Sequence, residues 1–86
     1  MLCGGVGNFK PVDGEATALA NKHRADAQAK MGANYATWTP TTFATQVVAG
    51  TNFMINVEVG GSTIQLKIFR PLPGQGDTSL TSCQAV

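Results

Sequence analysis

The sequence has little net charge and no long apolar run, and each shortage excludes a class of protein. Six basic and five acidic residues give a net charge of +1, too small a field to attract nucleic acid or an acidic lipid surface. No stretch approaches the roughly 18 consecutive apolar residues that a membrane span requires. Residues 1–5 also lack the basic and apolar segments of a secretion signal. We therefore expect no nucleic-acid partner, no membrane association and a cytoplasmic location.

Cysteine and histidine are too sparse for a metal centre. Cys3 and Cys83 stand near opposite ends of the chain, and His23 is far in sequence from both, so no zinc-site spacing occurs. The two thiols could close one disulfide, but a single pair without a secretory context favours free thiols. An enzyme with Cys3 or Cys83 as nucleophile and His23 as base would need these groups in contact. We predict no cofactor, no metal and no enzymatic activity, and a histidine that is satisfied by neighbouring groups or lies at the edge of the apolar stripe.

The first third of the chain predicts a trunk followed by a helix in a single domain of 86 residues. Residues 1–12 are glycine-rich and aperiodic, and Pro11 prevents a helix there, so this trunk is expected to be flexible. Asp13 can cap a helix that runs to Met31 and ends at Gly32. Its apolar residues recur at helical spacing and form a thin stripe: Ala16, Leu19, Ala20, Ala27 and Met31. Such a stripe allows one helix to lie closely on a sheet.

Beyond residue 35 the apolar pattern changes to the period of two that is typical of strands. Two runs alternate in this way: Phe53, Ile55, Val57 and Val59, then Ile64, Leu66 and Ile68. Gly60-Gly61 between them predicts a hairpin. Residues 38–48 predict an earlier strand with an irregular or edge position at Pro40, and residues 78–86 a last, shorter one. This order predicts the α+β class, with an antiparallel sheet of four to five strands against one α-helix.

One pentapeptide interrupts the strand pattern at a glycine: Gln46-Val47-Val48-Ala49-Gly50. It resembles the QVVAG hairpin of the stefins, the type 1 cystatins, which are small intracellular inhibitors of papain-like cysteine proteases. Two further segments match the family in order and spacing, Met1-Leu2-Cys3-Gly4 at the start and Leu72-Pro73-Gly74-Gln75 after a strand. Gly5 is an alternative to Gly4 for the family's glycine. The resemblance covers nearly the whole chain.

The resemblance implies a cystatin-like fold, in which the trunk adds a short strand and the sheet wraps around the helix. It also implies reversible, tight-binding inhibition of papain-like proteases such as the cathepsins, through a wedge formed where the three segments meet. The residues expected to contact the protease are Gly4, Gly5, Gln46, Val47, Val48, Ala49, Gly50, Leu72, Pro73 and Gly74. The wedge would cover the active site without offering a peptide bond for cleavage, so no covalent intermediate is expected.

The residue types in these segments agree with such a role. Val47 and Val48 offer small apolar side chains at a hairpin tip, and exposed apolar groups commonly mark a binding surface. Leu72 stands between two prolines, which lower in advance the backbone entropy lost on binding. Glycine at position 4 or 5 would allow the backbone to approach a cleft wall closely.

Several alternatives remain open. QVVAG could be a plain turn whose valines pack inward, and the fold could belong to a non-inhibitory binding or scaffold protein. The active form is expected to be a monomer, but a straightened QVVAG loop would allow two chains to exchange their helices in a non-inhibitory dimer. The stefins continue beyond the position of Val86 and have a tyrosine where this chain has Cys83, so a weaker attachment of the last strand is expected.

Overall fold

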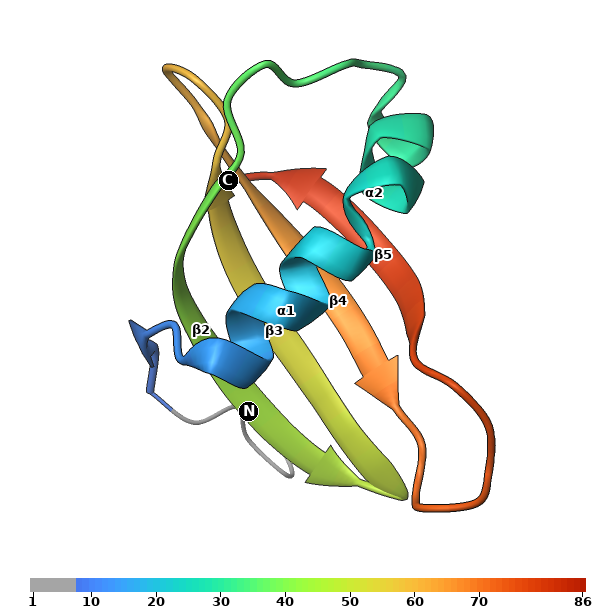
Figure 1. Cartoon of the computed structure of the whole chain (residues 1–86). Coiled ribbons are helices and arrows are strands. Elements are labelled where there is room, and N and C mark those ends of the chain that lie inside the picture. Colours follow the sequence, from blue (N-terminus) through green and yellow to red (C-terminus); the bar gives the residue numbers. More distant parts are fainter. Residues whose placement is uncertain (1–7) are drawn as a thin grey trace.

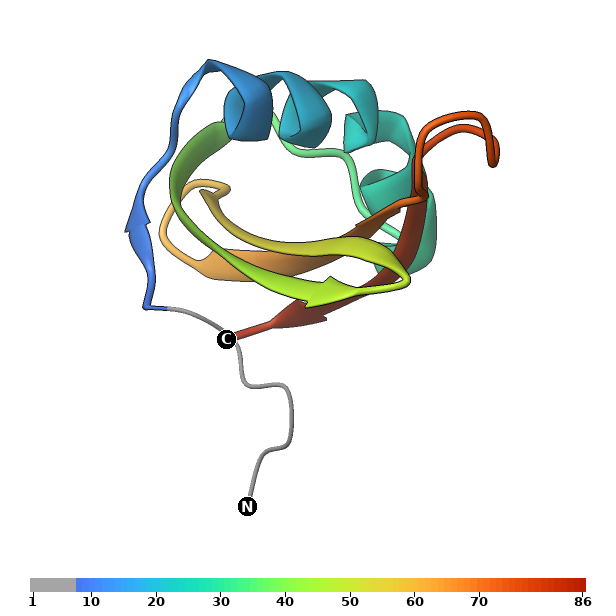
Figure 2. The same ribbon diagram turned by 90° about the horizontal axis from the view of Figure 1, so that it is seen from below.

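The computed structural model describes residues 8–86. Its elements are β1 (Lys10–Pro11), α1 (Gly14–Lys22), α2 (Arg24–Met31), β2 (Thr39–Val48), β3 (Gly50–Glu58), β4 (Thr63–Arg70) and β5 (Ser79–Ala85). The five strands form one antiparallel sheet in sequence order. The sheet curves around the helices, which lie on one of its faces (Figures 1 and 2). The predicted α+β class and the order of elements are confirmed.

The helix expected over residues 13–31 is divided into two at His23. This residue has φ −101° and ψ 15° and separates α1 from α2. The second helix, α2, runs in a different direction and packs against β5 (Figure 1). His23 is buried, with only 4% of the residue exposed. Its Nδ1 lies 2.9 Å from Asp26 Oδ2 and its Nε2 lies 2.9 Å from Thr78 Oγ1. No proline or glycine marks the break, so helical periodicity could not show it. Neither helix among residues 8–86 is long and apolar enough to cross a bilayer.

The core lies between the helices and the sheet, where the two predicted apolar patterns meet. Buried residues come from both: Ala16, Leu19, Ala20 and Ala27 on the helices, and Phe43, Phe53, Ile55, Val57, Ile64, Leu66 and Ile68 on the strands, with Val59 directly after β3. Met31 and Trp38 pack against this cluster and are partly buried. Each large side chain that is fully buried contributes about 1.5–3 kcal/mol. The alanine stripe allows the helices to approach the strand side chains closely.

Both ends of the helical segment are formed as the sequence predicts, and the first can be tested. Asp13 Oδ1 accepts a hydrogen bond of 2.8 Å from the Ala16 amide, and Gly32 ends α2 in the left-handed conformation at φ 65°. We expect Asp13→Ala to lower the free energy of unfolding by about 1 kcal/mol, because an amide of the first turn loses its acceptor. Urea denaturation measures this loss. Asp13→Asn, which keeps an acceptor, is the control and should retain most of the stability.

The pairing of the strands places two turns at the same end of the sheet. β2 pairs with β3 as far as Val48 opposite Gly50, with a register shift at Pro40 that confirms the irregularity predicted there. β3 pairs with β4 with Thr51 opposite Arg70, so the start of β3 lies beside the end of β4. The β2–β3 tip and the β4–β5 loop therefore lie side by side at the lower end of the molecule in Figure 1.

Candidate functional site

Two exposed loops stand next to each other at this end of the sheet. The β2–β3 tip comprises residues 47–50, in which Ala49 alone lies between the two strands, and the β4–β5 loop covers residues 71–78. A cavity of about 570 Å³ lies between them, lined by Gly50, Thr51, Arg70, Pro71, Leu72, Pro73, Gly76, Asp77 and Thr78. The structure thus brings together two of the three segments predicted to contact a partner. Gly4 and Gly5, the third, lie outside the described residues.

The β2–β3 tip directs its apolar side chains to solvent. Val47 is 80% exposed and Val48 46% exposed, and Ala49 is exposed as well. The interpretation of QVVAG as a turn with inward-packed valines does not agree with these values. Gln46 is set further back, half-buried, and its side-chain oxygen accepts a hydrogen bond of 3.2 Å from Asn52 on β3. Gln46 therefore joins the two strands below the tip.

Gly50 is the part of the motif that packs inward. It is buried and has φ 127°, a conformation that side chains with a Cβ rarely adopt. A Cβ atom there would lie 2.6 Å from the Arg70 carbonyl oxygen and 2.8 Å from the Phe69 ring. Only glycine leaves room for this approach, so Gly50 holds the β2–β3 tip against the end of β4.

The β4–β5 loop begins with a tight turn that presents a leucine. The Gln75 amide donates to the Leu72 carbonyl at 3.0 Å, and Gly74 has φ 83°. Proline at the second position and a glycine of positive φ at the third are the signature of a type II turn. Leu72 is 53% exposed, and Pro73 and Gly74 are exposed. The turn thus holds an apolar side chain in solvent on a backbone with little freedom.

Exposed apolar side chains gather on these two loops. The large hydrophobic residues that are exposed within residues 8–86 are Phe9, Val47, Val48, Leu72 and Val86. Three of these five belong to the two loops, which are adjacent in space. The neighbouring charged residues are paired with the helix, because Arg70 contacts Glu15 and Asp77 contacts Lys22. A small apolar surface of this kind is typical of a protein-binding site.

Asp77, at the end of the β4–β5 loop, is held as a carboxylate by its neighbours. Lys22 Nζ lies 2.6 Å from Asp77 Oδ1, and the Thr78 amide donates to the same oxygen at 2.7 Å. These hydrogen bonds and the charge of Lys22 hold the pKa of Asp77 below its ordinary value. The folded state therefore binds this proton less readily than the unfolded chain does.

This lowered pKa predicts a pH dependence of stability with a definite sign. The contribution of Asp77 is fully present above its unfolded pKa of about 3.9 and is lost as the pH falls through the lower folded value. We expect Asp77→Asn to reduce the fall in stability as the pH decreases below about 4, by a small amount because the pair is exposed. Urea midpoints at several pH values measure the effect, and Glu58→Gln is the control for the loss of one exposed carboxylate. An unchanged pH profile in Asp77→Asn would contradict the prediction.

The cysteine and histidine of the described residues do not form a catalytic pair. Cys83 is a free, half-buried thiol, and burial raises the pKa of this thiol, which keeps it protonated and weakly nucleophilic. Both ring nitrogens of His23 are bound to Asp26 and Thr78, so neither is available to deprotonate a thiol. Cys3 lies outside the described residues.

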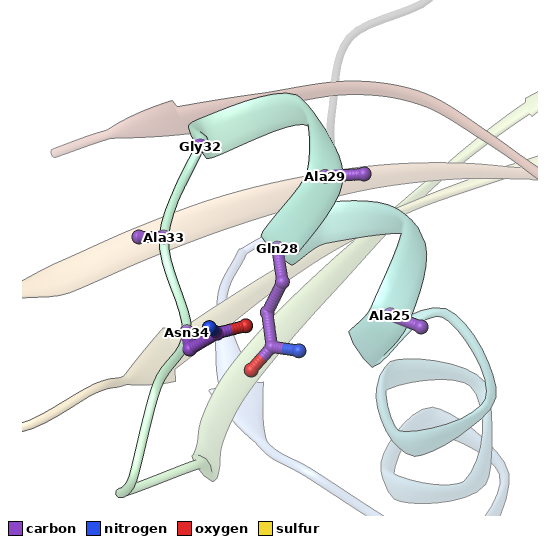
Figure 3. Close-up of a pocket in the computed structure, with 6 residues that line it drawn as sticks. All are labelled: Ala25, Gln28, Ala29, Gly32, Ala33 and Asn34. Atoms are coloured by element: carbon purple, nitrogen blue, oxygen red, sulfur yellow. The ribbon is translucent and has the colours of Figure 1, made fainter.

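A second hollow lies at the other end of the molecule, between α2 and the segment that follows it. It has a volume of about 390 Å³ and is lined by Ala25, Gln28, Ala29, Gly32, Ala33 and Asn34 (Figure 3). The Gln28 side-chain oxygen accepts a hydrogen bond of 2.9 Å from the Tyr35 amide. The lining consists of alanines, a glycine and two neutral amides, so it offers no charged or nucleophilic group to a ligand.

Comparison with known proteins identifies the family, although no protein-family model matches the chain. The chain is 36% identical to cystatin-A of Homo sapiens over 86 residues, covering 98% of this chain and 88% of the relative. It is 32% identical to cystatin-B of Oplegnathus fasciatus over 77 residues, covering 88% and 77%. The chain belongs to the stefins. Another relative, from Sus scrofa, is named leukocyte cysteine proteinase inhibitor 1 and is 36% identical over 78 residues, covering 90% and 76%. These stefins are named as cystatins or inhibitors and not as enzymes.

Sequence reasoning missed the polar residues that join the helices to the β4–β5 loop. Glu15 contacts Arg70, and Lys22 contacts Asp77. In each pair the two residues are 55 positions apart. In the sequence, nothing distinguishes Glu15 and Lys22 from the other charged residues of the helical segment. Their spacing places both side chains on one side of α1. This spacing indicates a contact with the loop only when the loop is known to lie beside the helix.

Proposed function

We propose that this stefin is a reversible, tight-binding inhibitor of papain-like cysteine proteases of the cathepsin type. The observation that supports it best is the exposure of Val47, Val48 and Leu72 on two adjacent loops. The names of the relatives support the same class of target, since one of them is a cysteine proteinase inhibitor. In this proposal the β2–β3 tip and the β4–β5 loop enter the active-site cleft together and exclude the substrate.

Affinity would come mainly from apolar contact. Burial of apolar surface contributes about 25 cal/mol per Å², from which the cost of association is subtracted. The tip and the loop are stiffened before binding by Gly50 packed on β4 and by the Leu72–Gln75 turn, so little further entropy is lost when they bind. Gly4 or Gly5 would add a third contact by following the cleft wall closely.

The mode of inhibition would be occlusion. The wedge covers the protease's cysteine and histidine but places no peptide bond in position for attack, so the inhibitor leaves intact. Membership of the stefins supports a cytoplasmic setting, and the monomer is the form that presents the β2–β3 tip. A dimer formed by straightening this tip would lose the valine-bearing turn and would not inhibit.

A titration of active-site-counted papain, repeated with a cathepsin, tests the proposal. Purified monomer is added in increments, peptide-substrate turnover is followed, and the integrity of the chain is checked afterwards. We expect near-stoichiometric loss of activity that is regained on dilution and competition, with the chain uncut. Full protease activity at a large molar excess would overturn the proposal and favour the non-inhibitory scaffold with the same fold.

A further inference from the structure

Both ends of the β4–β5 loop are attached to the helical layer by polar contacts. At the start of the loop Arg70 contacts Glu15. At its end Lys22 Nζ lies 2.6 Å from Asp77 Oδ1 and 2.9 Å from Thr78 Oγ1. Glu15 and Lys22 are seven positions apart in α1, about two helical turns, and therefore project from the same side. Figure 2 shows the loop beside the helical layer.

His23 adds a buried attachment at the end of the loop. Its Nε2 lies 2.9 Å from Thr78 Oγ1, and its Nδ1 faces the Asp26 carboxylate. A carboxylate only accepts, so in the neutral ring Nδ1 bears the hydrogen and Nε2 accepts the Thr78 hydroxyl proton. Thr78 Oγ1 in turn accepts from Lys22. One arrangement thus satisfies the hydroxyl and both ring nitrogens.

We call these contacts the helix clamp: Glu15 with Arg70, Lys22 with Asp77 and Thr78, and His23 with Thr78. Between its two ends the loop contains Gly74 at φ 83° and Gly76 at φ 120°. Glycine gives a chain many alternative conformations, and fixing each residue costs about 1–2 kcal/mol in backbone entropy. Within the loop, the Leu72–Gln75 turn supplies one hydrogen bond, and the Thr78 amide donates another to Asp77 Oδ1 next to it. The position of Leu72 relative to the β2–β3 tip therefore depends on how the ends of the loop are held.

We propose that the helix clamp preorganises the β4–β5 loop for protease binding, and that Lys22 and His23 are positioning residues of the site. This inference rests on the proposed function. Neither residue belongs to the exposed tips, so each would act through Thr78 and the loop. Without the clamp, a smaller fraction of molecules would have the loop in the binding conformation, and the apparent affinity would fall by that fraction. Association would slow, whereas dissociation, which depends on the tip contacts, would change little.

Binding kinetics against papain test the kinetic part of the inference. We expect Lys22→Met combined with Thr78→Val to slow association about 3- to 10-fold, with a change in dissociation below about 2-fold. Lys30→Met removes the same charge from an exposed position of α2 and is the matched control. The charge-swapped variant Lys22→Asp/Asp77→Lys, which restores an ion pair, should associate faster than the Lys22→Met/Thr78→Val variant. Unchanged association in the double variant would overturn the inference.

Amide hydrogen exchange of the free protein tests the loop without any protease. We expect exchange at residues 74–77 to become faster in the Lys22→Met/Thr78→Val variant, while the amides of β3 and β4 keep their rates. Faster exchange throughout the sheet would show a general loss of stability and would overturn a positioning role. This readout also separates two failures. A parent protein that does not inhibit refutes the proposed function, whereas unchanged loop exchange refutes the clamp.

Discussion

Val48→Asp is expected to weaken papain binding by at least about 100-fold, which corresponds to about 2.7 kcal/mol. Val48 is 46% exposed at the β2–β3 tip, so in the free protein the aspartate would remain hydrated and the fold would be unaffected. In the complex the same carboxylate would enter an apolar cleft without a partner, and burying an unpaired charge is costly. The loss should arise mainly from faster dissociation, measured as separate association and dissociation rates.

A matched control for this substitution is present in the chain. Val86 is also an exposed valine, at 65%, and it pairs with Thr63 at the start of β4, the end of the sheet opposite to the two loops. Val86→Asp introduces the same charge on the same residue type and should leave papain binding within about 2-fold of the parent. Urea midpoints of both variants should lie close to that of the parent. Equal affinity of Val48→Asp and Val86→Asp would refute the contact assigned to the β2–β3 tip.

Features that depend on local pattern could be predicted from the sequence. The alternation of Ile64, Leu66 and Ile68 gave the buried face of β4, because side chains of a strand point to opposite faces at a period of two. Asp13 and Gly32 gave the two ends of the helical segment, because capping depends on a few adjacent residues. The order of hairpins followed from these elements, whereas the placement of the β2–β3 tip beside the β4–β5 loop was implied by the resemblance to the stefins.

Features that depend on contacts between distant residues could not be predicted in this way. His23 interrupts a segment rich in alanine and other strong helix formers. One of the two groups that hold its ring is Thr78, 55 positions away. The sequence alone did not decide whether Val47 is exposed, because the same five residues could form either an exposed tip or a turn with inward-facing valines. In the structure Val47 is 80% exposed, and the residue of the motif that packs on β4 is Gly50. Local sequence specifies the tip, but its neighbours decide which side chains face outward.

The five residues of the QVVAG segment therefore have different structural roles. Val47, Val48 and Ala49 are exposed, Gln46 is bonded to Asn52 below the tip, and Gly50 is buried against β4. The exposed residues are available for a partner, whereas Gly50 contributes to stability and to the placement of the other three. Substitutions at Val48 and at Gly50 should accordingly differ in kind: the first should affect binding alone, and the second should affect folding as well.

Gly50→Ala is expected to lower the free energy of unfolding by about 2–4 kcal/mol, a large share of the 5–15 kcal/mol typical of a domain. Part of this cost is backbone strain at φ 127°, about 1–3 kcal/mol. The rest arises because the new methyl group would meet the Arg70 carbonyl oxygen at 2.6 Å, and a backbone atom in a paired strand cannot move aside easily. The tip would have to separate from β4, so papain binding should weaken as well.

Gly76→Ala separates the two parts of this cost. Gly76 has φ 120°, close to the value for Gly50, but an added Cβ would meet nothing within 4 Å. Gly76→Ala should therefore lower the free energy of unfolding only by the backbone strain, about 1–3 kcal/mol. Urea denaturation of both variants gives the difference directly. A larger loss at Gly50 than at Gly76 means that close packing against β4 fixes the tip. Equal losses would mean that backbone conformation alone requires glycine in the motif, and the proposed dependence of the tip on Arg70 would be refuted.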